Sequence, residues 1–350
     1  MSLESFLQFK ISKDGLKPRK LDSLPRFALI CGAISSGKKS LAFYNLDDFV
    51  YIDMSDLRFI NADFKSFIEK NNIKNLIINE PCTEFKLGKI ERCYILSSNK
   101  NYSYKDFIKI KLDFLDYEEF ISFSKKNYSP SEHLSNYLLL GQNPANVELS
   151  ALNAALNTQK ILKQSLSENE IIALKELALK IGTQTSILNL FKEFLKHKKI
   201  SKNDFFKCIY SLEDKFLLHW VKHIDKNLKK PYFCDFSMKN SLSFKKDFSK
   251  TYENLIANEL LMVYDEIFYD YDISFIIKSA NLGILCEAFT NKDFIKLKSK
   301  KLSKRAKDLG INQILVLSLN EQFKDSFDGV KFIGQTLNTW LISKELNDWD

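Results

Sequence analysis

A short loop bounded by glycines near the start of the sequence constrains the fold more than any other feature. The loop reads Gly32-Ala-Ile-Ser-Ser-Gly37-Lys38. It follows an apolar run with the composition of a strand, residues 26–31, and it opens a segment that we expect to be helical. Glycines let successive backbone N–H groups turn toward phosphate oxygens, and the dipole of the following helix favours an anion there. The sequence therefore predicts a strand–loop–helix unit that holds phosphate.

The residues of this loop have separate expected roles. Lys38 would reach the β- and γ-phosphates, while the backbone between Gly32 and Gly37 would cradle them. The next position normally carries a hydroxyl group that holds Mg²⁺, but Lys39 occupies it here and Ser40 comes one residue later. An incidental glycine turn without a ligand is the alternative. The predicted nucleotide-binding residues are Gly32, Ser35, Ser36, Gly37, Lys38, Lys39, Ser40 and Leu41.

Short apolar runs alternate with polar or helical stretches between residues 26 and 112. Their β-branched and aromatic side chains and nearly continuous hydrophobicity are typical of buried parallel strands. The segments between them are long enough for helices, and this alternation predicts an α/β fold. The predicted strands are 26–31, 49–53, 75–79, 92–97 and 107–112.

Polar residues end two of these predicted strands. Asn79 stands where an aspartate would organise the metal ion, and Glu80 is the predicted catalytic residue, because it would polarise an attacking water. Residues 97–99 (Ser-Ser-Asn) end the next strand, where a polar sensor of the γ-phosphate would lie. We predict Ser40 and Asn79 as metal ligands and expect weak or absent hydrolysis, since both depart from the usual pattern. The alternative for Glu80 is a solvated side chain at a strand end.

The pattern changes to helices between residues 132 and 230. Ser167 and Glu170 form a predicted capping box that opens one helix, and Gly182 ends it. Two more helices and two extended stretches follow, which is the outline of a winged helix. From residue 237 onward the pattern is again mixed α/β. The elements predicted after Gly182 are helices at 185–196, 201–212, 251–263 and 297–309, extended stretches at 216–221, 231–236, 267–271, 273–278, 283–289 and 313–318, and a closing helix after 336.

The chain resembles the prokaryotic AAA-type ATPases that join a P-loop module to a winged helix and a carboxy-terminal domain with a restriction-endonuclease-like core. Segments 32–40, 76–80 and 94–99 match in order. Further matches are Leu112-Asp-Phe-Leu-Asp-Tyr-Glu-Glu-Phe120, Tyr137-Leu-Leu-Leu-Gly141-Gln-Asn-Pro144, Pro231-Tyr-Phe-Cys-Asp235 and Glu253-Asn-Leu-Ile-Ala-Asn-Glu259. We therefore predict an α/β fold with three domains: a P-loop NTPase parallel sheet (1–145), a helical winged-helix region (146–236), and a small, degenerate nuclease-like α/β domain (237–350).

The resemblance also identifies what the last domain has lost. In that family the carboxy-terminal core carries paired acids and a lysine, which hold a metal ion and orient water for nuclease chemistry. This sequence keeps Asp272 but has Ser274 at the second acid, and it keeps Glu287 but has Phe289 where the lysine belongs. Glu253, Asp272 and Glu287 form a remnant of the site. The resemblance therefore implies a retained scaffold without nuclease activity.

Basic residues offer an alternative function. The predicted winged helix presents Lys202, Asn203, Lys207, Lys226, Lys229 and Lys230 for phosphate contact, and Lys296–Lys307 is the densest basic run. A solvated helix face is the default interpretation of such a run. The third helix is apolar through Phe205, Phe206, Ile209 and Tyr210, which favours packing against a neighbouring domain. DNA binding remains an alternative that the net charge of +8 permits. His219 and His223, near Cys208 and Cys234, match no ordinary zinc spacing.

The remaining expectations concern location and partners. Six cysteines without a CxxC pair suit reduced thiols, and no signal peptide or membrane span is expected, so we predict a cytoplasmic protein with no membrane partner. We expect ATP binding with Mg²⁺, weak or absent hydrolysis, and a nucleotide that regulates domain packing or partner binding. The alternatives are a non-enzymatic interaction scaffold with a relic P-loop and a DNA-binding module. A protein partner or a homo-oligomer remains open.

Overall fold

The computed structural model describes residues 12–21, 23–56, 58, 63–81 and 85–343. The chain divides into two compact units. The first contains the residues up to Phe114 together with 214–216, and the second contains 115–213 and the residues from Leu217 onward. The boundaries near 145 and 236 that the sequence analysis expects both fall inside the second unit. The division into three domains stays a prediction.

The first unit is built on a sheet of five parallel strands in the order β2-β3-β4-β1-β5. All five predicted strands are confirmed, and their ends differ from the prediction by at most one residue. A parallel five-stranded sheet in a mixed α/β unit fits a P-loop NTPase core. The strands are β1 (Phe27–Cys31), β2 (Val50–Asp53), β3 (Asn75–Asn79), β4 (Arg92–Ser97) and β5 (Ile108–Lys111).

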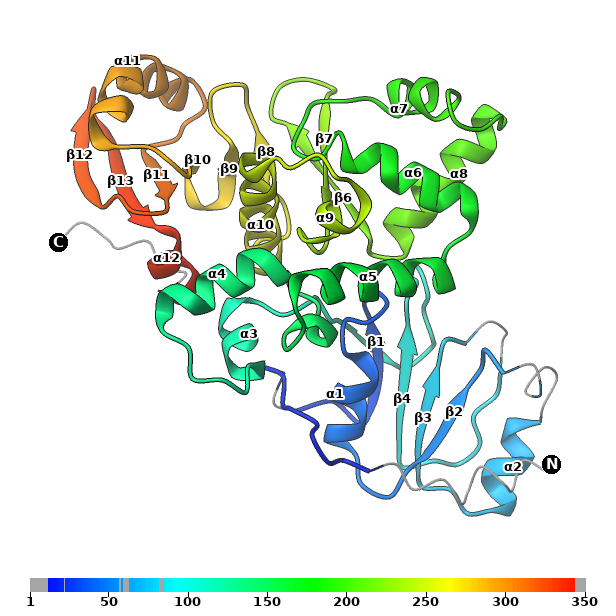
Figure 1. Cartoon of the computed structure of the whole chain (residues 1–350). Coiled ribbons are helices and arrows are strands. Elements are labelled where there is room, and N and C mark those ends of the chain that lie inside the picture. The colour runs from blue at the N-terminus through cyan, green and yellow to red at the C-terminus, as the bar shows by residue number, and fades with distance from the viewer. Residues whose placement is uncertain (1–11, 22, 57, 59–62, 82–84, 344–350) are drawn as a thin grey trace. The chain divides into compact units, whose positions relative to one another are not determined.

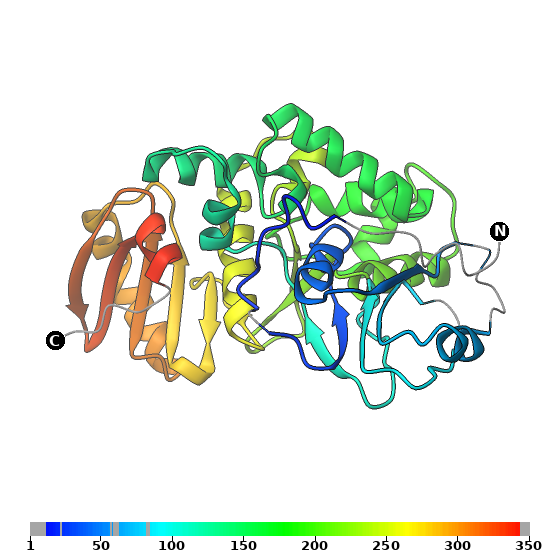
Figure 2. The same cartoon turned by 90° about the horizontal axis from the view of Figure 1, so that it is seen from below.

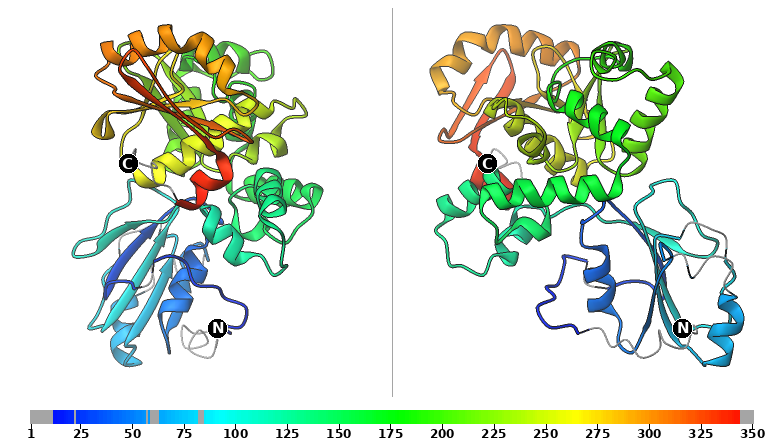
Figure 3. Two further views of the ribbon diagram at one scale, coloured as in Figure 1. Left: turned by 90° about the vertical axis from the view of Figure 1, so that its left-hand side faces the viewer. Right: turned by 45° about the vertical axis from the view of Figure 1, so that its right-hand side comes forward.

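Helices cover both faces of this sheet, as Figure 3 shows in its right panel. Helix α1 (Lys38–Asn45) buries Leu41 in the same hydrophobic cluster as Ile30 of β1. Helix α2 (Phe64–Lys70) buries Phe67 in another cluster, which contains Leu29. Leu29 and Ile30 are neighbours in one strand and therefore point to opposite faces. The central strands β1, β3 and β4 are buried on both sides because each side of the sheet has its own helix.

The second unit contains an eight-stranded mixed sheet in the order β12-β13-β11-β10-β9-β8-β6-β7. The hairpin that the sequence analysis assigns to a winged helix, β6–β7, pairs through β6 with β8. It thus extends the sheet formed by the last part of the chain (Figure 1). The strands are β6 (Leu218–His223), β7 (Lys229–Phe233), β8 (Phe268–Tyr269), β9 (Phe275–Ile277), β10 (Leu282–Cys286), β11 (Gln313–Ser318), β12 (Phe323–Phe327) and β13 (Val330–Thr336).

Two long helices pack against this sheet. Leu285 of β10 lies in a hydrophobic cluster with Ile295 of α11, whereas the neighbouring Ile284 faces Leu260 of α10. The two helices therefore lie on opposite faces of the sheet (Figure 1, Figure 2). The helices of this unit are α3 (Tyr117–Phe123), α4 (Pro130–Leu140), α5 (Ala151–Ser165), α6 (Glu168–Ala178), α7 (Ile187–Phe194), α8 (Lys202–Asp214), α9 (Met238–Leu242), α10 (Phe248–Val263), α11 (Lys292–Asp308) and α12 (Leu337–Ser343).

The apolar side of α8 is used for packing within the chain. Phe205 is fully buried, and its ring contacts the rings of Phe191 and Phe194 on α7. Ile209 and Leu212 continue the buried side. Hydrophobic side chains at these spacings form one face of a helix, so Phe205, Ile209 and Leu212 of the expected recognition helix belong to the core, whereas Tyr210 is 52% exposed.

Candidate functional site

The glycine loop lies at the carboxyl edge of the first unit's sheet. It begins directly after β1, which pairs with β4 on one side and β5 on the other. The Gly32 N–H donates to the Ser97 carbonyl (3.1 Å), so the loop starts beside the end of β4. In open parallel sheets, ligands bind outside the carboxyl ends where the strand order reverses. The loop therefore occupies the place where this class of fold binds ligands.

Close packing explains the first glycine of the loop, and backbone conformation explains the second. A Cβ atom on Gly32 would lie 2.2 Å from the Leu112 carbonyl oxygen, closer than any side chain tolerates. Gly37 precedes α1 with φ 95°, and Ser35 also has a positive φ of 63°. Residues with positive φ turn the chain sharply, and glycine adopts that conformation without strain. The sequence thus fixes the tight turn that precedes the helix.

The side chain of Lys38 bonds back to the start of the loop. Its ammonium group donates to the carbonyl oxygens of Gly32 (2.7 Å) and Ala33 (2.8 Å) and to the hydroxyl oxygen of Ser98 (3.0 Å). The nearest carboxylate oxygen recorded for it, on Glu80, lies 3.9 Å away. The side chain is only 6% exposed, and burial lowers the pKa of Lys38 to about 8, although Glu80 opposes this effect.

The loop itself contains a second buried polar group. The Ser36 hydroxyl oxygen is fully buried and has no hydrogen-bond partner among the described residues. The backbone carbonyl of Ser36 accepts from the guanidinium group of Arg19 (2.7 Å), which also donates to the carbonyls of Asp113 (3.0 Å) and Phe114 (3.2 Å). Arg19 therefore ties the loop to the chain that follows β5. This role of Arg19 was not predicted from the sequence. Arginine is rare in this lysine-rich chain, and that rarity could have indicated a special role.

Glu80 and Ser98 connect the ends of β3 and β4. The Ser98 N–H donates to one carboxylate oxygen of Glu80 (2.9 Å), and the Ser98 hydroxyl donates to the other (2.6 Å). Glu80 has a positive φ of 47°, and its N–H donates to the Leu96 carbonyl. Both carboxylate oxygens are thus engaged by the residue expected to sense phosphate. The catalytic role of Glu80 stays a prediction.

Lys39 points to a different acid. Its ammonium group lies 3.2 Å from Oδ2 of Asp53, the last residue of β2. The same oxygen accepts from the Tyr51 hydroxyl (2.9 Å) and from the Asn79 side-chain amide (3.0 Å). Burial acts to raise the pKa of Asp53, but hydrogen bonds from Ser55, Asn79, Tyr51 and Lys39 outweigh it and lower the pKa to about 2.

The structure thus brings the predicted site residues to one edge of the sheet. Asp53 and Asn79 are register partners at the ends of adjacent strands, and the sequence alone does not show which strands pair. Ser40 follows Lys39 on α1 and is rotated by about 100° from it around the helix axis. The binding roles of Ser35, Ser40 and Leu41 stay predictions.

The acids predicted as a nuclease remnant each contact lysine. Glu253 accepts from the Tyr232 hydroxyl (2.6 Å) and from Lys230 (2.9 Å). Asp272 pairs with Lys301, and Glu287 pairs with Lys298 at 3.2 Å. In the described residues, no three His, Cys, Asp or Glu side chains stand close enough together to hold a metal ion.

Several basic residues expected to meet nucleic acid contact other parts of the second unit. On α11, Arg305 donates to Asp270 and to Asp225. Lys229 lies over the ring of Trp220, and Lys226 lies over the ring of Tyr271. These basic side chains are thus engaged by ion pairs and by aromatic rings of the same unit. DNA binding stays a prediction.

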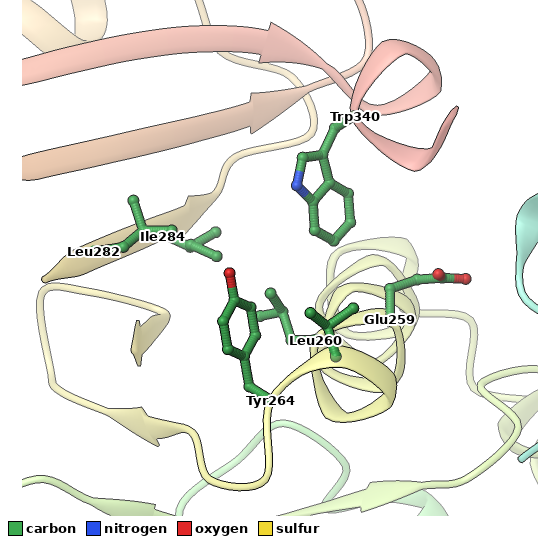
Figure 4. A pocket seen from close by; sticks show the side chains of 7 residues that line it. Glu259, Leu260, Tyr264, Leu282, Ile284 and Trp340 are labelled. Carbon is green, nitrogen blue, oxygen red and sulfur yellow. The ribbon is translucent and has the colours of Figure 1, made fainter. Parts of the chain in front are cut away.

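The described part of the second unit includes a smaller and a larger cavity. Figure 4 shows the smaller one, of about 20 Å³, between Leu260, Tyr264, Leu282, Ile284 and Trp340. A space of this size holds one water molecule and no ligand. The larger cavity has a volume of about 350 Å³ and is lined by Gln159, Leu162, Lys163, Ile171, Lys175 and residues 240–244. Neither cavity was predicted from the sequence.

In the part of the chain that the structure describes, every helix is too short or too polar to cross a lipid bilayer. No protein-family model matches the chain. No curated protein matches its sequence.

The solved structures that are similar over part of the chain include two ATPases. A Walker-type ATPase of Pyrococcus abyssi is 13% identical with a TM-score of 0.39, over 61% of this chain and 90% of that one. A signal transduction ATPase with numerous domains (STAND) and a tetratricopeptide repeat sensor, from Pyrococcus horikoshii, is 16% identical with a TM-score of 0.28. That match covers 68% of this chain and 44% of the other, so this chain spans less than half of the STAND protein.

Proposed function

We propose that the first unit binds ATP through the loop from Gly32 to Lys38 and hydrolyses it slowly or not at all. The environment of Lys38 carries this proposal. Its ammonium group is buried and is held by neutral carbonyl and hydroxyl oxygens, with the nearest recorded carboxylate 3.9 Å away. Burying a charge is costly unless a partner of opposite charge is close. A phosphate group in the loop would supply that partner.

Weak hydrolysis follows from the residues around the loop. Catalysis of phosphoryl transfer depends on a metal ion that neutralises charge and on a group that positions water. Lys39 replaces the hydroxyl at the metal position, and Asn79 is a neutral amide that donates to Asp53. Glu80 accepts two hydrogen bonds from Ser98. ATP would therefore act as a bound regulator of domain packing or partner binding.

The alternative of a scaffold with a relic loop depends on whether Lys39 fills the phosphate site. Its ammonium group lies at Asp53, whereas Lys38 lies at the carbonyls of Gly32 and Ala33. The contacts of Lys39 therefore do not favour the scaffold. The alternative of DNA binding gains no support either, because Lys298, Lys301 and Arg305 are paired with acids.

Titration calorimetry with ATP tests this proposal. The native chain should bind with micromolar affinity, and Lys38→Ala should lose at least about tenfold, equal to about 1.4 kcal/mol. Lys65→Ala on α2 is the matched control, because this lysine is exposed and pairs with Glu69 on its own helix; its affinity should be unchanged. Failure of the native chain to bind ATP would refute the proposal.

A further inference from the structure

A second ammonium group is held at the edge of the sheet that carries the proposed ATP site. Lys39 follows Lys38 in the chain, and its Nζ lies 3.2 Å from Oδ2 of Asp53. Asp53 is opposite Asn79 in the register of β2 and β3. The loop follows β1, and Asp53 and Asn79 are the last residues of β2 and β3. Because the strands are parallel, these groups lie at the same carboxyl edge of the sheet.

The residues at this edge do not fit Mg²⁺. This ion needs near-octahedral oxygen coordination and is usually held by carboxylates together with substrate phosphates. The structure offers a lysine in place of the hydroxyl ligand, and the Asn79 amide turns an N–H group toward Asp53. The two carboxylates here are already engaged: Asp53 accepts from Lys39, Tyr51 and Ser55, and both oxygens of Glu80 accept from Ser98. Ser40 and Asn79 as Mg²⁺ ligands stay a prediction, and the donor set argues against it.

We propose, building on the proposed function, that the ammonium group of Lys39 takes the place of the metal ion, so that the site binds the triphosphate of ATP without Mg²⁺. Lysine is a compact positive charge that neutralises phosphate well. Asp53 holds the ammonium group, as a carboxylate would hold the metal. Lys38 and Lys39 would then together neutralise the negative charge of the triphosphate, part of which a metal ion otherwise neutralises.

The side chain of Lys39 has the freedom that this role requires. It is 51% exposed, and Asp53 is its one hydrogen-bond partner among the described residues. An ammonium group has three N–H donors, so donors remain for phosphate oxygens. The buried hydroxyl of Ser36, which lacks a partner in the described part of the chain, provides a further donor from within the loop.

Calorimetric titrations with ATP in excess EDTA and in excess Mg²⁺ test the inference, using the full chain. The native protein should bind equally well in both buffers. Lys39→Thr restores the usual hydroxyl, so its affinity should fall by about tenfold or more in EDTA and recover when Mg²⁺ is added. Lys39→Arg keeps the charge and should stay independent of the metal. Lys65→Thr is the control for loss of an exposed lysine.

The outcomes separate this inference from the proposed function. If the native chain binds ATP only with Mg²⁺, or if Lys39→Thr binds as tightly as the native chain in EDTA, Lys39 does not replace the metal and ATP binding still stands. If the native chain binds ATP in neither buffer, the proposed function fails as well. Circular dichroism of each variant shows whether lost binding reflects lost folding.

Discussion

At the scale of single residues, Lys38 is subject to two opposing effects. Burial removes water from its ammonium group and lowers its pKa to about 8, while the carboxylate of Glu80 acts in the other direction. An incoming triphosphate would add negative charge beside it and raise the pKa again. Proton uptake and phosphate binding at this residue are therefore linked.

This linkage predicts how ATP affinity varies with pH. Below about pH 8 Lys38 is charged in the free protein, and the affinity should be constant. Above it, binding must recharge the amine, so the affinity should fall, by up to about tenfold per pH unit. Calorimetry between pH 7 and pH 10 measures this slope. Lys38→Arg stays charged throughout and should show a flat profile; a flat native profile would contradict the prediction.

Arginine has a structural use in this lysine-rich chain. The sequence contains only Arg19, Arg26, Arg58, Arg92 and Arg305. Arg19 donates to three backbone carbonyls around the loop, and Arg305 bridges Asp225 and Asp270. The planar fork of a guanidinium group can serve several acceptors at once, which a lysine cannot do in the same geometry. Such positions are recognised from contacts, because the sequence around them has no pattern.

At the scale of secondary structure elements, the sequence predicted the first unit well. Its central strands β1, β3 and β4 are short hydrophobic runs buried on both faces, so hydrophobicity alone locates them. The hairpin β12–β13 was missed because its first strand is half exposed and polar. Asp328 and Gly329 join the two strands with φ values of 49° and 76°. An Asp-Gly pair between alternating residues is a strong hairpin signal, so this element could have been found.

The orientation of side chains at strand ends could not be predicted in the same way. The sequence identified Lys39 as a substitution at the metal position, but its ammonium group is placed by Asp53, which is 14 residues away on another strand. Several acids stand within that distance in the sequence, and the choice among them depends on sheet order and register. Strand order is a property of tertiary packing, which the local sequence does not encode.

The capping box of α6 provides a test at this scale. The Ser167 hydroxyl accepts from the Glu170 N–H, and the Glu170 carboxylate accepts from the Ser167 N–H (2.7 Å). Ser167→Ala should lower the free energy of unfolding by about 1 kcal/mol, whereas Ser167→Asp should keep most of it, because aspartate also caps helices. Urea unfolding followed by circular dichroism measures both. An equal loss in the two variants would show that the cap contributes little.

At the scale of the whole molecule, the second unit is joined by a buried polar network as well as by its hydrophobic core. The N–H of Gln142 donates to Asp235, whose side chain also accepts from Ser237. Asn258 donates to the side chain of Gln142 (2.7 Å) and to the carbonyl of Cys234 (2.9 Å). Three segments thus meet in one cluster, in which Gln142 lies more than 90 residues along the chain from Asp235 and Asn258. They are the segments 137–144, 231–235 and 253–259 that carry the sequence resemblance, so those motifs serve packing here.

Gly141 has an unusual position beside this network. Its φ of 80° and ψ of −160° lie in a region that is essentially limited to glycine. A Cβ atom there would lie 2.2 Å from the Ser237 hydroxyl oxygen and 2.3 Å from Oδ1 of Asp235. Burial raises the pKa of the Asp235 carboxyl, and hydrogen bonds from Ser237 and Gln142 oppose this effect. A methyl group would displace those donors.

Gly141→Ala should therefore destabilise the second unit by about 3–5 kcal/mol, through backbone strain and the loss of buried hydrogen bonds. Gly310→Ala is the matched control, because Gly310 also has a positive φ, of 70°, but has no atom within 4 Å of the added methyl. It should lose only about 1–2 kcal/mol, from strain alone. All three tryptophans follow residue 217, so their fluorescence during urea unfolding reports on this unit. Equal losses in the two variants would mean that the network adapts to the methyl group, and a larger loss for Gly141→Ala would mean that it joins the distant segments rigidly.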